Sequence, residues 1–192
     1  MFIKNWKKEI LTIPNLLSLF RLVLIPVYVL IYLNAKEATD YYLAAGILAV
    51  SCLTDMIDGQ IARHFHMISS FGKILDPLAD KATQFTLIIC LAVKYSVLRY
   101  LVILFVIKES FQLIAGGINL RKGIMLKGAL ISGKICTTVL FLSLIIMVMI
   151  PDLEVNIINI IVIINALFMM IAFINYVIAY FFLENKFQSI DK

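Results

Sequence analysis

The sequence predicts an all-α integral membrane protein, with six transmembrane helices and a short N-terminal amphipathic helix at the membrane surface. Of its 192 residues, 62% are hydrophobic and only 15% are charged, whereas soluble domains average about 45–50% apolar and about 25% charged residues. Apolar runs recur along the whole length, and each can supply the roughly 17–25 residues that a helix needs to cross a bilayer. These observations exclude an ordinary soluble globular domain.

The surface helix is expected over residues 2–11, FIKNWKKEIL. Helical spacing places Phe2, Ile3, Trp6 and Ile10 on one face and lysines on the other, which is typical of helices that lie in the membrane interface. The alternative is a basic tail without fixed structure. No A-x-A-like cleavage site follows, so we expect the first apolar run to remain as a transmembrane helix.

The six expected spans follow one another without a soluble insertion, so residues 1–192 are interpreted as one membrane domain. The second span must reach about residue 62, because its uncharged part, residues 41–53, covers only about 20 Å at about 1.5 Å per residue. The third is expected to begin at Pro77, since proline suits the first turn of a helix. The expected spans lie near residues 13–33, 41–62, 77–94, 98–120, 130–150 and 157–183.

The distribution of lysine and arginine predicts the orientation of the chain. Basic residues gather before the first span, after the second and fourth spans, and in the C-terminal tail, whereas the loops on the other side carry only Lys36, Lys94 and Arg99. We therefore expect both termini, and the loop between the second and third spans, to face the cytoplasm.

Two pairs of acidic residues stand at the facing ends of the second and third expected spans. Asp55 and Asp58 are three residues apart in TDMIDGQIAR, and Asp76 and Asp80 are four apart in GKILDPLADK, so each pair shares one helical face. The short connection lets the two helices pack antiparallel and bring four carboxylates together. The alternative is that Asp76 is a plain helix cap and the acids are unrelated charges.

Four carboxylates in one partly buried pocket repel one another by several kcal/mol unless cations neutralise them. Oxygen-only ligation suits Mg²⁺ or Mn²⁺, and two such ions about 3.5–4 Å apart stabilise both the attacking and the leaving oxygen of a phosphoryl displacement. The sequence therefore predicts a site for two divalent cations, Mg²⁺ or Mn²⁺, at Asp55, Asp58, Asp76 and Asp80.

The acids belong to a longer pattern that resembles the signature of the CDP-alcohol phosphatidyltransferase family, D-x2-D-G-x2-A-R-x8-G-x3-D-x3-D. The segment TIPNLLSLFR, residues 12–21, is similar to the start of the first span in the phosphatidylglycerolphosphate synthases of that family, and DPLADK occurs in that branch and in its cardiolipin-synthase relatives. All eight fixed positions match: Asp55, Asp58, Gly59, Ala62, Arg63, Gly72, Asp76 and Asp80.

The resemblance implies transfer of a phosphatidyl group from CDP-diacylglycerol to an alcohol, with release of CMP. By that analogy Asp55, Asp58 and Asp76 ligate the two metal ions, while Asp80 completes the metal site and is the catalytic base that accepts the proton of the acceptor hydroxyl. The small and basic residues of the signature would bind the nucleotide: Gly59, Ala62, Arg63 and Gly72.

Glycerol 3-phosphate is the acceptor that the resemblance favours, and its roughly two negative charges require basic residues. Where many synthases have Ser-Arg-Glu, this chain has Ile107, Lys108 and Glu109, and lysine lacks the bidentate fork of arginine. A CMP-forming cardiolipin synthase, with phosphatidylglycerol as acceptor, therefore stays open. The candidates for binding the acceptor or its phosphate, some of which can equally be ordinary positive-inside residues, are Arg21, Lys81, Lys108, Arg121 and Lys134, with Lys122 and Lys127.

A cation transporter with intramembrane carboxylates is the alternative from another class. Such transporters often show broken helices in corresponding positions of two halves, whereas all four acids here fall within residues 55–80.

The expected partners are the two substrates and the lipid bilayer, without nucleic acid. Small residues such as Gly116 and Gly117 permit close helix packing, including packing across a homodimer.

Overall fold

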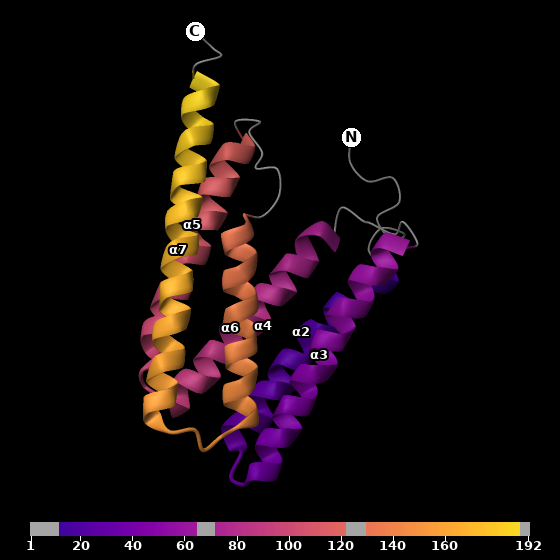
Figure 1. Cartoon of the computed structure of the whole chain (residues 1–192). Coiled ribbons are helices and arrows are strands. Elements are labelled where there is room, and N and C mark those ends of the chain that lie inside the picture. Colours follow the sequence, from indigo (N-terminus) through magenta and orange to yellow (C-terminus); the bar gives the residue numbers. More distant parts are fainter. Residues whose placement is uncertain (1–11, 65–71, 122–129, 189–192) are drawn as a thin grey trace. The chain divides into compact units, whose positions relative to one another are not determined.

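The computed structural model describes residues 12–64, 72–121 and 130–188, and within them the chain forms six helices and no strand (Figure 1). The all-α class is thereby confirmed for this part of the chain, and each expected span corresponds to one helix. The predicted surface helix, residues 2–11, lies outside the described residues. The helices are α2 (Ile13–Asn34), α3 (Ala38–His64), α4 (Gly72–Lys94), α5 (Leu98–Arg121), α6 (Ile131–Met149) and α7 (Val155–Gln188).

The start of α4 differs from the prediction. The helix begins at Gly72, more than one turn before Pro77, so Asp76 lies inside the helix and is not its cap. Pro77 is the sixth residue of α4, beyond the first turn, so its missing N–H removes one intrahelical hydrogen bond near the start of the helix. Asp76 and Asp80 therefore share a continuous helix.

Four helices of the described part, α2, α5, α6 and α7, are long and apolar enough to cross a membrane. Large apolar side chains point outward from them, including Leu30, Leu113 and Ile131, each more than 60% exposed. Such a surface is unfavourable in water and favourable in lipid. The chain is therefore a multi-pass membrane protein.

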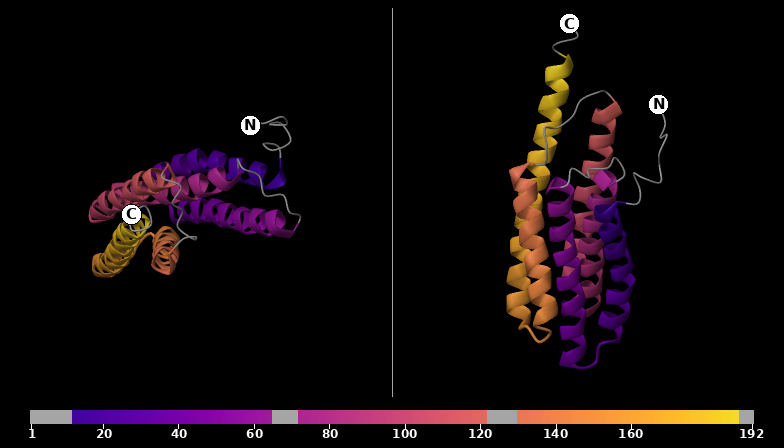
Figure 2. Two further views of the ribbon diagram at one scale, coloured as in Figure 1. Left: turned by 90° about the horizontal axis from the view of Figure 1, so that it is seen from above. Right: turned by 90° about the vertical axis from the view of Figure 1, so that its right-hand side faces the viewer.

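The first of two compact units comprises Met1–Cys90 and Val148–Pro151. It contains α2, α3 and most of α4. Two views show α2 and α3 as an antiparallel pair joined by the short connection 35–37 (Figure 2). The connection is closed by Asp40, whose carboxylate accepts hydrogen bonds from the backbone N–H groups of Lys36 and Glu37 at 2.8 and 3.1 Å. This hairpin fixes α2 against α3.

The second unit comprises Leu91–Met147 and Asp152–Lys192. In it, Phe111 of α5 meets Phe173 and Tyr180 of α7 edge to face, with ring centroids 5.2 and 6.1 Å apart. On α6, Gly133 lies directly against Tyr176 of α7, where a Cβ would stand 2.5 Å from the tyrosine hydroxyl. Aromatic packing on α7 thus holds this unit together. The prediction that residues 1–192 act as one domain stays a prediction.

Candidate active site

The polar residues of α2 face inward. Asn15, Ser18 and Arg21 follow one another at intervals of three and are 1%, 0% and 2% exposed, while Leu19 and Phe20 between them are exposed. In a lipid-facing helix an apolar outer surface is favourable, and a polar or charged side chain must find partners inside the protein. The buried polar stripe of α2 therefore needs partners on α3 and α4.

Arg21 connects the two helices that carry the acids. Its Nη1 donates to Oδ1 of Asp55 on α3 and, at 2.6 Å, to Oδ1 of Asp80 on α4. The Arg21 side chain is 3% exposed, whereas the side chains of Asp55 and Asp80 are 46% and 44% exposed. The guanidinium thus lies behind the two carboxylates, and their other faces remain accessible.

Ser18 holds a third acid of the signature. Its hydroxyl donates to Oδ1 of Asp76 at 2.5 Å and lies 3.1 Å from the carbonyl oxygen of Pro14, one turn earlier on α2. Asp55, Asp76 and Asp80 therefore all contact one face of α2. Asp58 lies one turn beyond Asp55 on α3, and its side chain is outside the described part.

The chemistry of this cluster fits a divalent cation. Two carboxylates from different helices converge on a single positive charge, and Mg²⁺ is commonly held by one or two carboxylates together with substrate phosphates and water. Among the described side chains, no three His, Cys, Asp or Glu residues form a group that could hold a metal by themselves. Asp55 and Asp80 would hold the ion, with Asp58 and Asp76 as the further predicted ligands, and substrate oxygens would complete its coordination.

The predicted nucleotide-binding residues lie at the end of α3 and at the start of α4. Gly59, Ala62 and Arg63 occupy the last two turns of α3, and their side chains are outside the described part. Gly72 is the first residue of α4 and is buried. Their roles toward the nucleotide stay predictions.

The predicted acceptor residues have different surroundings. In the first unit, Lys81 follows Asp80 and is half-buried. In the second unit, Lys108 is 3% exposed and donates to Glu109 at 2.8 Å, whereas Arg121 and Lys134 are exposed. Arg21 is bonded to two carboxylates, as described above, while Lys122 and Lys127 lie outside the described residues. Their roles toward the acceptor stay predictions.

Ser18 is a site residue that was not predicted: it is absent from the eight-position motif and from the candidate acceptor residues. A local signal for it exists, because Asn15, Ser18 and Arg21 are the polar residues of an otherwise apolar segment and repeat at intervals of three. In a membrane helix this spacing predicts an inward-facing polar stripe. The same spacing does not identify which acid each residue contacts.

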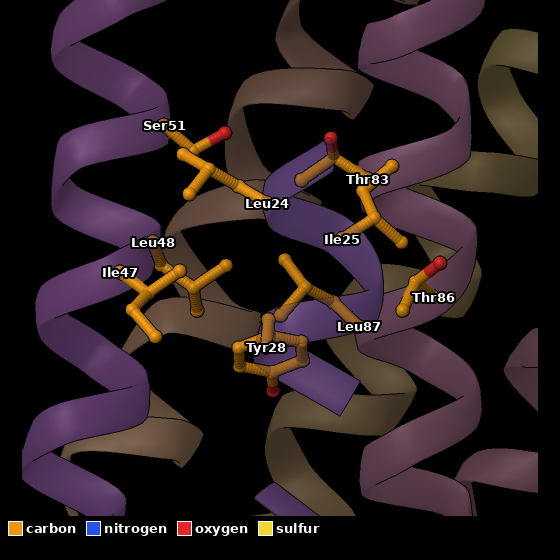
Figure 3. Close-up of a pocket in the computed structure, with 9 residues that line it drawn as sticks. All are labelled: Leu24, Ile25, Tyr28, Ile47, Leu48, Ser51, Thr83, Thr86 and Leu87. Carbon is orange, nitrogen blue, oxygen red and sulfur yellow. The ribbon is translucent and has the colours of Figure 1, made fainter. Parts of the chain in front are cut away.

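The same three helices, α2, α3 and α4, line a small, partly open cavity (Figure 3). Its volume of about 10 Å³ is close to the space of one water molecule. Ser51 lies one turn from Asp55, and Thr83 lies three residues from Asp80, so their hydroxyls line the end of the cavity nearer the acids. The remaining lining is mostly apolar: Leu24, Ile25, Tyr28, Ile47, Leu48, Thr86 and Leu87.

Comparison with known proteins places this helical, acid-bearing chain in a family. The sequence profile of the CDP-alcohol phosphatidyltransferases matches residues 11–181. The chain belongs to the CDP-alcohol phosphatidyltransferase family.

The names of individual relatives describe two kinds of synthase. A protein of Aquifex aeolicus named CDP-diacylglycerol–glycerol-3-phosphate 3-phosphatidyltransferase is 31% identical over 171 residues, which are 86% of this chain and 94% of that protein. A cardiolipin synthase (CMP-forming) of Streptomyces coelicolor is 32% identical over 118 residues, 60% of this chain and 54% of that protein. A cardiolipin synthase (CMP-forming)/mitochondrial hydrolase fusion protein of Schizosaccharomyces pombe is 44% identical over 90 residues, 46% of this chain and 14% of that protein.

The chain thus spans about half or less of the two cardiolipin-synthase relatives and nearly all of the Aquifex protein. All three names describe phosphatidyl transfer or cardiolipin synthesis, and none describes a transporter.

Proposed function

We propose that this protein transfers a phosphatidyl group from CDP-diacylglycerol to glycerol 3-phosphate and releases CMP, a step of phosphatidylglycerol biosynthesis. The observation that carries the proposal is the Aquifex relative, because its name states this reaction and it aligns over 86% of this chain and 94% of its own length. The family profile over residues 11–181 supports the same class of reaction. The transporter alternative has no support and is not proposed.

In the proposed reaction, the acceptor hydroxyl forms a new P–O bond to the phosphatidyl phosphorus, and the P–O bond to CMP breaks. Asp80 accepts the proton of the hydroxyl. Its side chain is 44% exposed while one of its oxygens is bonded to Arg21, so the group is both oriented and accessible, as a general base must be. Arg63 and the small residues Gly59, Ala62 and Gly72 bind the nucleotide.

Two divalent cations, Mg²⁺ or Mn²⁺, would be held by Asp55, Asp58, Asp76 and Asp80. When bound, they supply positive charge to the diphosphate and to the developing oxyanions. The chain itself supplies positioning, which with charge neutralisation accounts for most of the catalysis in phosphoryl transfer. Ser18 and Arg21 support this assignment, because they hold three of these carboxylates on one side.

A CMP-forming cardiolipin synthase is the second candidate function. The Streptomyces coelicolor and Schizosaccharomyces pombe relatives, at 32% and 44% identity, favour it. The two functions differ in the acceptor, which is a small phosphorylated alcohol in one and a lipid in the other. The basic residues that would bind glycerol 3-phosphate are Lys81, Lys108, Arg121 and Lys134.

We further propose that all six described helices span the membrane, preceded by an interfacial helix over residues 2–11, with both termini and the acid site on the cytoplasmic side. The basic residues support this orientation, because they gather at one set of connections. We also propose a homodimer that packs through small residues, because these allow close contact between membrane helices.

The proposal is tested by incubating the purified full chain in detergent with CDP-diacylglycerol and Mg²⁺ or Mn²⁺, and measuring CMP release. Glycerol 3-phosphate, phosphatidylglycerol, inositol phosphate and serine are supplied in separate reactions. Release only with glycerol 3-phosphate is expected. Release only with phosphatidylglycerol would establish the cardiolipin-synthase function, and no release with any acceptor would contradict both.

A further inference from the structure

Arg21 is one of two buried residues among the described basic residues predicted for the site. Its side chain is 3% exposed, and Lys108 is buried as well, whereas Arg121 and Lys134 are exposed. A charge removed from water is retained only where partners compensate it. Here Asp55 and Asp80 do so, each from a different helix. The buried positive charge of Arg21 is therefore compensated by the carboxylates of Asp55 and Asp80.

The acids outnumber the positive charge that α2 offers them. Arg21 supplies one charge to Asp55 and Asp80, while the bond that Ser18 donates to Asp76 comes from a neutral hydroxyl. The cluster therefore keeps a negative charge that attracts cations. Part of its charge is nevertheless already compensated, and a divalent ion that binds the accessible faces of the carboxylates meets a fixed positive charge directly behind them.

We propose that Arg21 is a built-in counter-cation that assembles the acids before metal binds and lowers their affinity for the divalent ion. This inference rests on the proposed metal-dependent transfer and deepens it. Without metal, Arg21 prevents Asp55 and Asp80 from repelling each other and ties α2, α3 and α4 together. With metal, like-charge repulsion between Arg21 and the ion keeps the ion exchangeable.

The direction in which removal of Arg21 changes the affinity for metal separates this role from two others. If Arg21 served only as a structural link or only oriented the acids, its removal would weaken metal binding, as the loss of supporting contacts to metal ligands usually does by about 10–100-fold. If Arg21 bound only the acceptor phosphate, its removal would leave the affinity for metal alone unchanged. A counter-cation predicts that neutralising Arg21 makes metal bind more tightly.

The experiment measures Mn²⁺ binding to the purified full chain in detergent, without substrate, from the electron paramagnetic resonance signal of free Mn²⁺. The variants are Arg21→Gln, which removes the charge and keeps a hydrogen-bond donor, and Arg21→Lys, which keeps the charge. The control is Lys36→Gln. It removes one positive charge from the same unit, about 22 Å of helix away at about 1.5 Å per residue, which exceeds the screening length of about 8 Å in physiological salt.

We expect Arg21→Gln to bind Mn²⁺ at least about tenfold more tightly than the unmodified chain. One unit charge a few Å from a divalent ion accounts for about that factor even at the dielectric constant of water. Arg21→Lys and Lys36→Gln should stay within about threefold of the unmodified chain. Unchanged or weaker binding by Arg21→Gln would overturn the inference.

Thermal unfolding provides a second readout that does not depend on activity. In EDTA, Arg21→Gln should unfold at a lower temperature than the unmodified chain, and Mn²⁺ should raise its unfolding temperature by a larger amount. An equal metal-induced rise in the two proteins would overturn the inference. If the unmodified chain releases CMP and binds Mn²⁺, but Arg21→Gln shows neither tighter Mn²⁺ binding nor a larger metal-induced rise in unfolding temperature, only the inference fails. If the unmodified chain binds no Mn²⁺, the metal site and the inference fail together.

Discussion

The contact between Gly133 and Tyr176 predicts that Gly133→Ala destabilises the protein. A Cβ at position 133 would stand 2.5 Å from the Tyr176 hydroxyl oxygen, 2.8 Å from Cε2 and 3.1 Å from Cζ. The ring cannot easily retreat, because Tyr176 is 6% exposed and is stacked on Tyr180. Overpacking of this kind lowers the free energy of unfolding by about 1–3 kcal/mol. It opposes the roughly 0.8–1.0 kcal/mol that alanine gains over glycine inside a helix.

Gly117→Ala is the matched control, because a Cβ at Gly117 meets no atom within 4 Å. Both variants gain the same helix propensity, so the difference between them isolates the steric term. At about 2–4 °C per kcal/mol for a chain of this size, Gly133→Ala should unfold at least about 2 °C below Gly117→Ala in detergent. Adding Tyr176→Phe removes the nearest atom and should restore part of the loss. A Gly133→Ala protein as stable as Gly117→Ala would refute the reasoning.

Four further predictions concern the site. Asp80→Asn should fold, as judged by gel filtration and thermal unfolding, but release CMP at least about 100-fold more slowly, because general acid–base catalysis contributes about 10²–10⁴-fold; near-normal turnover would contradict the assigned role. Excess EDTA should abolish transfer, and Mg²⁺ or Mn²⁺ should restore it; full activity in EDTA would exclude the metal site. Ser18→Ala should slow transfer by about tenfold, because Asp76 would lose the hydrogen bond from the Ser18 hydroxyl and a hydrogen bond to a charged group contributes about 1.5–3 kcal/mol. Unchanged turnover would show that this bond does not position Asp76. Lys108→Gln should destabilise the protein because it removes the positive charge that pairs with the mostly buried carboxylate of Glu109, and adding Glu109→Gln should restore stability. A raised KM for glycerol 3-phosphate that persists in the double variant would support an acceptor role for Lys108, and a normal KM would exclude it.

The number and order of the described helices could be predicted from the sequence. Six apolar runs predicted six helices, and all six expected spans correspond to described helices, because length and composition act within each segment. The start of α4 was predicted wrongly at Pro77 rather than Gly72. Proline restricts the backbone near itself and does not exclude another helical turn before it.

Part of the candidate site could be predicted from the sequence. The spacing of Asp55, Asp76 and Asp80 predicted that these acids share one site, and the structure brings all three to α2. The predicted roles of Asp58, Gly59, Ala62 and Arg63 stay predictions, as do those of the acceptor bases. Ser18 is not among the predicted site residues, because the interval of three that it shares with Asn15 and Arg21 predicts an inward-facing stripe but no particular partner.

The sequence by itself determined the class of protein and the order of its helices, and it predicted the residues that would carry the chemistry. These depend on composition and on spacings of three or four residues, which a helix converts directly into a shared face. Only the tertiary structure decided which residues Arg21 contacts. Its partners lie 34 and 59 positions further along the chain, and no local pattern distinguishes a buried arginine that binds carboxylates from one that awaits a phosphate. That choice follows from how α2, α3 and α4 pack, because a buried charge must take the nearest compensating partner that packing provides.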